Sequence, residues 1–174
     1  MLKRKINCSI KILICLFTVV FADTGPTVIK QTYRFKTLPD DGSYSLILNN
    51  ISGDLIVSGN EGSGAFINVE KITFGIKKED IPNIHKKENI IVTHLKDQNQ
   101  INITGDSSNS NTDFIQTSIK LDLPKNISLN FNINGGDISI NRIIGGIKIS
   151  TLGGDILIKD SEGEINSLSH GGTI

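Results

Sequence analysis

The stretch that decides the fold is residues 135–174, which read GGDISINRIIGGIKISTLGGDILIKDSEGEINSLSHGGTI. A glycine recurs there every nine residues, and an isoleucine follows each glycine two positions later. The glycines are Gly136, Gly145, Gly154, Gly163 and Gly172, and the isoleucines are Ile138, Ile147, Ile156, Ile165 and Ile174. A second position, four residues after the glycine, holds isoleucine in the first three units and Ser167 in the fourth. This single register predicts a repeat of short strands.

Each nine-residue unit has room for one strand and one turn. The strand would point two apolar side chains inward, and the glycine would take a turn conformation that a β-carbon opposes. One unit cannot bury its own apolar face, but stacking at about 4.8 Å places isoleucine over isoleucine. The stronger likeness at eighteen residues, between residues 135–137 and 153–155, predicts an all-β fold: a parallel β-solenoid of nine-residue half-coils, about 18 residues per coil. A meander of hairpins is the competing geometry.

The first twenty-two residues differ from the rest of the chain. Lys3, Arg4, Lys5 and Lys11 precede a short apolar run over residues 12–21, and Ala22 follows it. These three parts predict a signal peptide over residues 1–22, because an apolar run of about ten residues is too short to span a bilayer. Cleavage would remove four cations, leaving 14 basic and 18 acidic residues, and both cysteines, Cys8 and Cys15. We therefore expect an exported protein, in the periplasm, on the outer surface or secreted, that has no disulfide or thiol chemistry.

Residues 23–174 are predicted to form a single β-repeat domain. Its regular repeats span residues 119–174, where alternation of apolar and polar residues begins before the glycine series. A charged stretch at about residues 75–88 is expected to be an irregular insertion, as a short helix or a surface loop. Residues 105–113, rich in serine and asparagine, are expected to form an exposed polar loop.

The sequence resembles a known bacterial family. Leu-Pro at residues 123–124, followed by Gly-Asp-Ile-Ser-Ile, Gly-Gly-Ile-Lys-Ile, Gly-Asp-Ile-Leu-Ile and Gly-Glu-Ile, is similar to the bacterial putative-adhesin domain of unknown function. Residues 52–57, Ser-Gly-Asp-Leu-Ile-Val, are similar to an earlier copy of the same unit. The likeness covers roughly residues 44–174. It implies an exported, β-solenoid-like domain at the bacterial envelope, and it carries over no catalytic residues.

No pattern in the chain points to a cofactor, a catalytic residue or a metal ligand set. Asp137 and Asp155 would stack in an eighteen-residue coil and form a weak cation site, although two solvated turn aspartates are the more ordinary interpretation. The calcium-binding pattern Gly-x-Gly-x-Asp is absent, and His85, His94 and His170 have no metal-type spacing. Outward residues such as Ser128, Asn130, Asn132, Asn134, Ser139 and Lys148 are expected to form flat polar faces that could contact carbohydrate.

These observations predict a non-catalytic envelope or surface protein, adhesin-like or scaffolding, that presents a polar face to an envelope, matrix or carbohydrate partner. The alternatives are a carbohydrate-active β-helix enzyme and an envelope-stress sensor domain. The enzyme is disfavoured because such enzymes are longer and stack sugars on aromatic side chains, whereas this chain has no Trp and two Tyr. The balanced charge and the absence of a basic block argue against nucleic acid as a partner. End-to-end self-association is a further expectation.

Overall fold

The computed structural model describes residues 16–20, 26–39, 41–75, 79–80, 83, 89–105 and 115–174. Most of the charged stretch at residues 75–88 and of the polar loop at 105–113 lies outside the described residues, as does most of the predicted signal peptide. Within the described part of the chain, no helix has the length and apolarity needed to cross a membrane.

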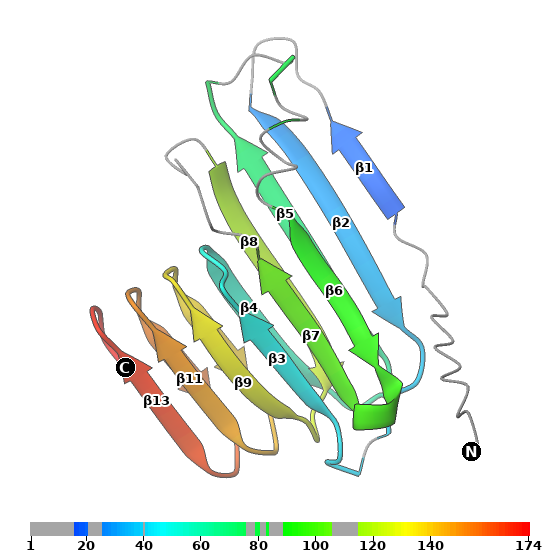
Figure 1. The fold of residues 1–174 in the computed structure, drawn as a ribbon. Helices are drawn as coiled ribbons and strands as arrows, with labels where there is room; N and C mark the ends of the chain where they lie inside the picture. Colours follow the sequence, from blue (N-terminus) through cyan, green and yellow to red (C-terminus); the bar gives the residue numbers. More distant parts are fainter. Residues whose placement is uncertain are drawn as a thin grey trace, which may run out of the picture.

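The described chain is all-β, as predicted, and its strands form two sheets that face each other across an apolar core (Figure 1). Sheet A has the order β1 (Leu16–Val20), β2 (Thr27–Phe35), β5 (Ala65–Thr73), β8 (Ile115–Pro124), β4 (Asp54–Asn60), β10 (Ile138–Asn141) and β12 (Ile156–Lys159). Sheet B has the order β13 (Ile165–Ser169), β11 (Ile147–Thr151), β9 (Ser128–Ile133), β3 (Ser45–Asn49), β7 (Gln100–Gly105) and β6 (Ile90–Leu95). A 3-10 turn, η1 (Lys96–Gln98), joins β6 to β7.

The parallel β-solenoid predicted for the whole domain is not confirmed, because both sheets are mixed. In sheet A, β1 with β2, β2 with β5, and β5 with β8 are antiparallel pairs, and in sheet B β6 with β7 is antiparallel. Strands β2, β5 and β8 are nine or ten residues long, about twice the length of the strands in the repeats. Length does not set the direction of pairing, since the six-residue strands β6 and β7, joined by η1, form an antiparallel hairpin.

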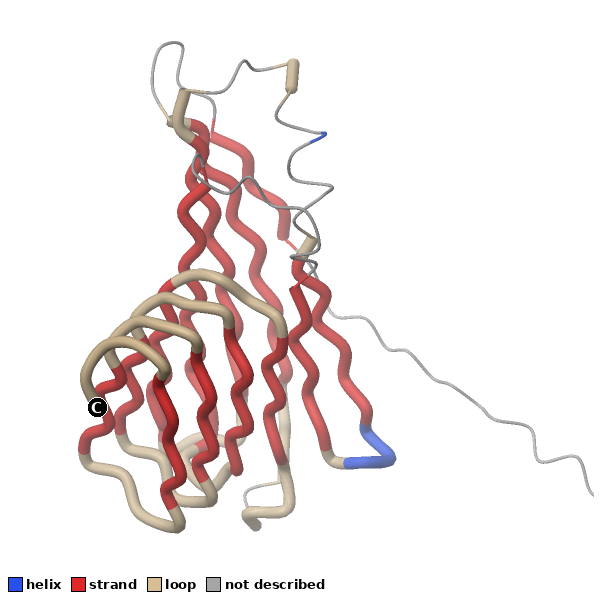
Figure 2. The backbone as a smooth tube through the Cα atoms, turned by 60° about the vertical axis from the view of Figure 1, so that its left-hand side comes forward, coloured by secondary structure: helices blue, strands red, loops and turns tan. Residues whose placement is uncertain are grey.

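The repeats have a different arrangement from these long strands. From β9 to β13 the chain alternates between sheet B and sheet A, and each strand pairs in parallel with the strand two steps along. Ile138 pairs with Ile156, and Ile147 pairs with both Leu129 and Ile165, so partners are eighteen residues apart. Figure 2 shows the resulting rungs and the loops that connect them at one end of the molecule. Nine-residue neighbours therefore lie on opposite sheets.

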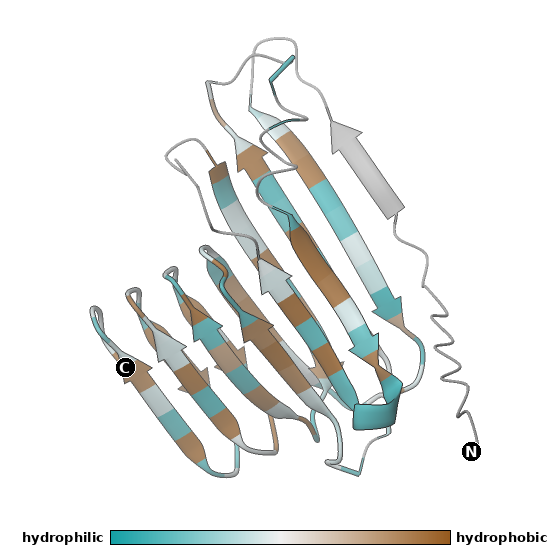
Figure 3. Cartoon of the chain, in the orientation of Figure 1, coloured by the Kyte–Doolittle hydropathy of each residue, from teal (hydrophilic) through white to brown (hydrophobic). Residues whose placement is uncertain are grey.

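The core fills the space between the two sheets with aliphatic side chains from nearly every strand. Alternation along each strand sends one residue inward and the next outward, and Figure 3 shows these bands along the strands. Core residues no more than 2% exposed include Leu46, Leu48, Ile67, Ile101, Ile103, Ile119, Leu121, Leu129, Phe131, Ile138 and Ile147. These side chains form a single cluster, so the N-terminal antiparallel part and the repeats share one core.

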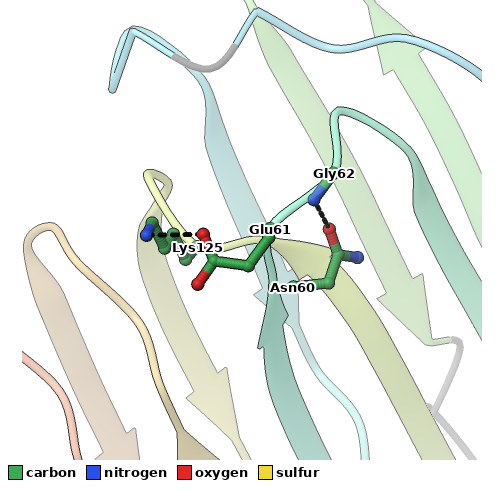
Figure 4. A network of polar contacts seen from close by, with 4 residues as sticks. All are labelled: Asn60, Glu61, Gly62 and Lys125. Carbon is green, nitrogen blue, oxygen red and sulfur yellow. Dashed lines mark hydrogen bonds and ion pairs between the residues drawn. The ribbon is translucent and has the colours of Figure 1, made fainter.

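A small polar network joins two turns at one end of the sheets (Figure 4). Lys125, after β8, places its Nζ atom 2.7 Å from Oε2 of Glu61, after β4. Asn60 accepts a hydrogen bond from the Gly62 N–H at 2.8 Å and donates one to Asp122 Oδ1 at 2.7 Å. Because the Glu61 side chain is 82% exposed, this ion pair contributes little to stability.

Candidate functional site

The repeat glycines lie in the turns between the two sheets, with positive φ angles between 95° and 154°. At Gly154, φ is 95°, and a β-carbon would lie 2.2 Å from the carbonyl oxygen of Gly136. At Gly136, φ is 109°, and a β-carbon would lie 2.1 Å from the carbonyl oxygen of Gly53. Gly136 and Gly154 therefore stack in a column in which each backbone touches the previous rung, and only glycine fits both the conformation and the space. Gly145 and Gly163 belong to a second column, because a β-carbon at Gly163 would lie 2.3 Å from the carbonyl oxygen of Gly145.

The repeat isoleucines divide into two groups. Ile138, Ile147 and Ile156 are at most 4% exposed, as expected for inward positions. Ile165 and Ile174 are 42% and 64% exposed, which differs from the expectation that all five lie inward. Ile165 lies on β13, an edge strand of sheet B, and no later strand among the described residues covers it. Edge position alone does not expose this repeat position, because Ile156 on β12, an edge strand of sheet A, is 4% exposed.

Asp137 and Asp155, the candidate cation ligands, take part in a ladder of hydrogen bonds. Asp54 Oδ1 accepts from the Asp137 N–H at 3.1 Å, and Asp137 Oδ1 accepts from the Asp155 N–H at 2.9 Å. Asp155 Oδ1 in turn accepts from the Thr173 N–H at 2.7 Å. Each carboxylate therefore satisfies a backbone donor on the next rung. Among the described residues, no three His, Cys, Asp or Glu side chains gather into a possible metal site.

This ladder predicts a graded response to substitution at position 137. Replacing Asp137 with alanine removes the acceptor for the Asp155 N–H, and we expect a loss of about 1 kcal/mol in the free energy of unfolding. Asp137→Asn keeps an oxygen in place and should cost less than about 0.5 kcal/mol. Urea unfolding of the two variants measures the difference. A rise in the melting temperature with millimolar calcium that Asp137→Asn abolishes would instead show that the carboxylate binds a cation.

The outer face of sheet B carries rows of short polar side chains that cross from strand to strand. One row runs Asn102, Ile47, Asn130, Lys148 and Asn166, from β7 to β13. The next row runs Thr104, Asn49, Asn132, Ser150 and Leu168. We call the polar members of these two rows the polar face: Asn49, Asn102, Thr104, Asn130, Asn132, Lys148, Ser150 and Asn166.

The polar face is exposed and regular. Asn130, Asn132, Lys148 and Asn166 are exposed, and the strand spacing repeats their amide groups at about 4.8 Å. Lys148 is the one charged member, so the face can offer hydrogen-bond donors and acceptors with a single positive charge. This geometry suits an extended ligand with many hydroxyl or amide groups.

Two residues expected on such a face lie elsewhere. Ser139 is on the outer face of sheet A, between Ile56 and Leu157 in the adjacent strands. Asn134 follows β9, and its Nδ2 donates a hydrogen bond to Asn50 Oδ1 at 3.1 Å. The alternation of apolar and polar residues predicts that these two side chains point away from the core. It does not predict which sheet a residue belongs to or where a strand ends.

Sequence reasoning missed a partly buried pair of aromatic and titratable groups at the end of the core near β6. The Tyr44 hydroxyl lies 2.5 Å from Nε2 of His94, and the His94 ring meets Phe35 edge-on with centroids 5.0 Å apart. Burial lowers the pKa of His94, with a further contribution from nearby Lys96, and burial raises the pKa of Tyr44. His170 is exposed, and its Nδ1 lies 3.2 Å from the Thr151 carbonyl oxygen. His85 lies outside the described residues.

The lowered pKa of His94 predicts that the domain loses stability in mild acid. Because its usual pKa is 6.5, the unfolded chain takes up this proton more readily than the folded chain below that pH. Stability is therefore full above pH 6.5 and falls as pH drops below 6.5 towards the folded pKa. We expect melting temperatures between pH 7.5 and 5 to show this loss, and His94→Gln, which cannot titrate, to show less of it. An equal loss in both proteins would contradict the assignment.

Three solved bacterial structures are similar to this chain. A putative adhesin from Bacteroides fragilis has a TM-score of 0.52 at 17% identity, covering 83% of this chain and 60% of that one. A putative cell adhesion protein from Clostridium sporogenes has a TM-score of 0.48 at 12% identity, covering 80% and 68%. A putative lipid binding protein from Parabacteroides distasonis has a TM-score of 0.37 at 14% identity, covering 80% and 59%.

These comparisons bear on the fold. No family model and no curated protein matches the sequence. The chain spans about three fifths of the length of the Bacteroides fragilis protein, the one of the three with a TM-score above 0.5. At 17% identity the likeness shows a shared architecture, so this chain has the fold of a bacterial protein described as a putative adhesin.

Proposed function

We propose that this chain is an exported, non-catalytic binding module of the bacterial envelope that presents the polar face of sheet B to a surface partner. The observation that carries the proposal is the pair of polar rows that cross β7, β3, β9, β11 and β13. The fold shared with a putative adhesin and the signal-like sequence of residues 1–22 support the same conclusion.

We also propose that strands β9 to β13 form a solenoid-like stack with eighteen residues per coil, built onto the antiparallel part of the domain that includes β8. The parallel pairs eighteen residues apart support it, as does the column of glycines that touch the preceding rung. A stack of this kind keeps the polar rows flat, because each added coil repeats the same side chains at the same height.

The partner class that the polar face fits best is a polysaccharide. An extended chain of hydroxyl groups can hydrogen-bond to successive asparagine side chains, and a single lysine favours a neutral or weakly acidic chain over a strongly charged one. Each contact of this kind contributes about 0.5–1.5 kcal/mol, so binding needs several rows at once. We therefore expect weak affinity for single sugars and stronger binding to longer chains.

A glycan array with the exported protein tests this function, and the two faces of the molecule provide a matched comparison. Asn130→Ala with Lys148→Ala removes one small polar group and one lysine from the polar face. Ser139→Ala with Lys120→Ala removes the same chemistry from the outer face of sheet A. Binding lost in the first double variant and kept in the second supports the proposal. Equal binding by both would contradict it, and turnover of a polysaccharide would show an enzyme.

Export is tested independently of binding. The full chain, expressed in a bacterial host, should be recovered outside the cytoplasm with Asp23 as its first residue. Recovery of a cytoplasmic protein that begins at Met1 would contradict the signal-peptide prediction and leave the fold unchanged.

A further inference from the structure

We propose that the outer edge of β2 is a strand-binding site in the exported protein, filled by an extended segment of a partner protein. The proposal rests on the export proposed above, because removal of residues 1–22 is what opens this edge. It concerns a different surface from the polar face, so each can succeed or fail without the other.

The structure shows a strand seated on this edge. Strand β1 is the outermost strand of sheet A and pairs antiparallel with β2, from Val20 opposite Val28 to Leu16 opposite Thr32 (Figure 1). The other edge of β2 is used along its whole length, because β5 pairs with every residue from Thr27 to Phe35. The edge towards β1 is therefore the one place where β2 can take a further strand.

The segment seated there is one that export would remove. Residues 16–20 lie inside the predicted apolar part of the signal peptide, and cleavage after Ala22 leaves four residues before β2 begins. Strand β2 keeps its pairing with β5 after cleavage, so it remains in the sheet. The exported protein would then present the backbone edge of residues 28–32, which β1 covers here, as a template for another strand.

The side chains of β2 define what the occupant must look like. On one side of the strand Ile29 and Phe35 are buried, and Tyr33 packs against the core. On the other side Lys30 lies 2.9 Å from Glu70, and the guanidinium of Arg34 lies 4.9 Å from the centre of the Phe66 ring. The occupant should therefore alternate apolar residues, next to Ile29 and Tyr33, with acidic or hydroxyl residues next to Lys30 and Arg34.

The edge of β2 lacks the features that usually prevent another strand from pairing with a sheet edge. Residues 27–35 contain no proline, and no bulge interrupts their pairing with β5. Lys30, which could repel an approaching strand, is ion-paired with Glu70. The edge of β2 can therefore pair with a complementary strand of a partner. An acidic residue opposite Lys30 would strengthen the pairing of the two strands.

The experiment adds the displaced strand back in trans. The probe is a synthetic peptide with the sequence Leu-Phe-Thr-Val-Val, flanked by lysines for solubility, and the protein is the exported product that begins at Asp23. Amide hydrogen exchange in β2 should slow by about tenfold when the peptide binds, and exchange in β6, an edge strand of sheet B, should stay unchanged. Replacing the central threonine of the peptide with proline should abolish the protection.

The register of β1 on β2 predicts a charge preference that a peptide bound non-specifically would not show. The central threonine corresponds to Thr18, which pairs with Lys30. A peptide with aspartate there should bind a few-fold more tightly at low salt, and one with lysine should bind a few-fold more weakly.

The outcomes that overturn the proposal are distinct from those that overturn the proposed function. Absence of protection in β2, protection in β6 instead, or equal binding of the proline peptide would each overturn it. An exported protein that retains residues 1–22 would overturn it too, because β1 would then fill the edge in the same chain. If the protein forms a dimer through β2 without peptide, the occupant of the edge is a second copy of this chain, and the proposed partner segment is wrong. The double variant Asn130→Ala with Lys148→Ala should leave the peptide protection unchanged, whatever it does to glycan binding.

Discussion

Replacing Gly154 with alanine will lower the free energy of unfolding by about 3 kcal/mol or more, whereas Gly153→Ala will change it by less than about 0.5 kcal/mol. The two glycines are neighbours in one turn and differ in their surroundings. Gly154 has a φ of 95° and no room for a β-carbon beside the Gly136 carbonyl oxygen. At Gly153 a β-carbon would have no heavy atom of the described residues within 4 Å, apart from the adjoining residues of the chain.

Chemical denaturation of both variants, followed by circular dichroism, measures this contrast. The alanine at position 154 must either strain its own backbone or push the Gly136 rung away, and both weaken the stack. Alanine at position 153 does neither, and it controls for the reduced backbone freedom that alanine in place of glycine gives the unfolded chain. Equal effects at the two positions would show that the rungs are not in contact at the glycine column.

Truncating Ile147 to alanine will cost about 2–5 kcal/mol, and the same truncation at Ile165 will cost less than about 1 kcal/mol. The two residues are paired across β11 and β13 and occupy the same position in the repeat. Ile147 is 1% exposed, with a rung on either side, while Ile165 is 42% exposed. The difference therefore comes from how far each side chain is buried, since the residue type and the position in the repeat are the same.

Equilibrium unfolding of Ile147→Ala and Ile165→Ala in parallel gives the two costs. Similar losses would mean that Ile165 is covered in solution. In that case the molar mass measured by light scattering would show whether a second molecule covers Ile165, as end-to-end association would require.

The nine-residue register found the strands of the repeats and the inward direction of Ile138, Ile147 and Ile156, because alternation and turn glycines are local properties. It also predicted the eighteen-residue spacing at which β10 pairs with β12. It could not predict that β2, β5 and β8 form antiparallel pairs, because nothing in their alternation encodes the direction of a neighbouring strand. The prediction of a uniform solenoid therefore extended the repeat to the region of β2, β5 and β8, where glycine does not recur every nine residues.

The candidate surface was predicted in part for a similar reason. Outward positions such as Asn130 and Lys148 follow from alternation, but the rows that join them to Asn102 on β7 depend on pairing between distant segments. The contact between Tyr44 and His94 depends on residues fifty positions apart, and no spacing rule links them. The recurring Gly-Asp-Ile unit indicated that the aspartates occupy equivalent positions. Their hydrogen bonds to the next rung could not be predicted, because they depend on how the backbones stack.

The polar face and the glycine column both require that successive repeats alternate between the two sheets. Cross-linking tests this most directly, in the full chain with Cys8→Ser and Cys15→Ser. Lys148→Cys with Asn166→Cys places two thiols on adjacent strands of sheet B, and Lys148→Cys with Leu157→Cys places them on opposite outer faces. A short thiol-specific cross-linker should join the first pair, eighteen residues apart, and fail to join the second, nine residues apart. Efficient cross-linking of the nine-residue pair and none of the eighteen-residue pair would show a meander of hairpins and contradict this arrangement.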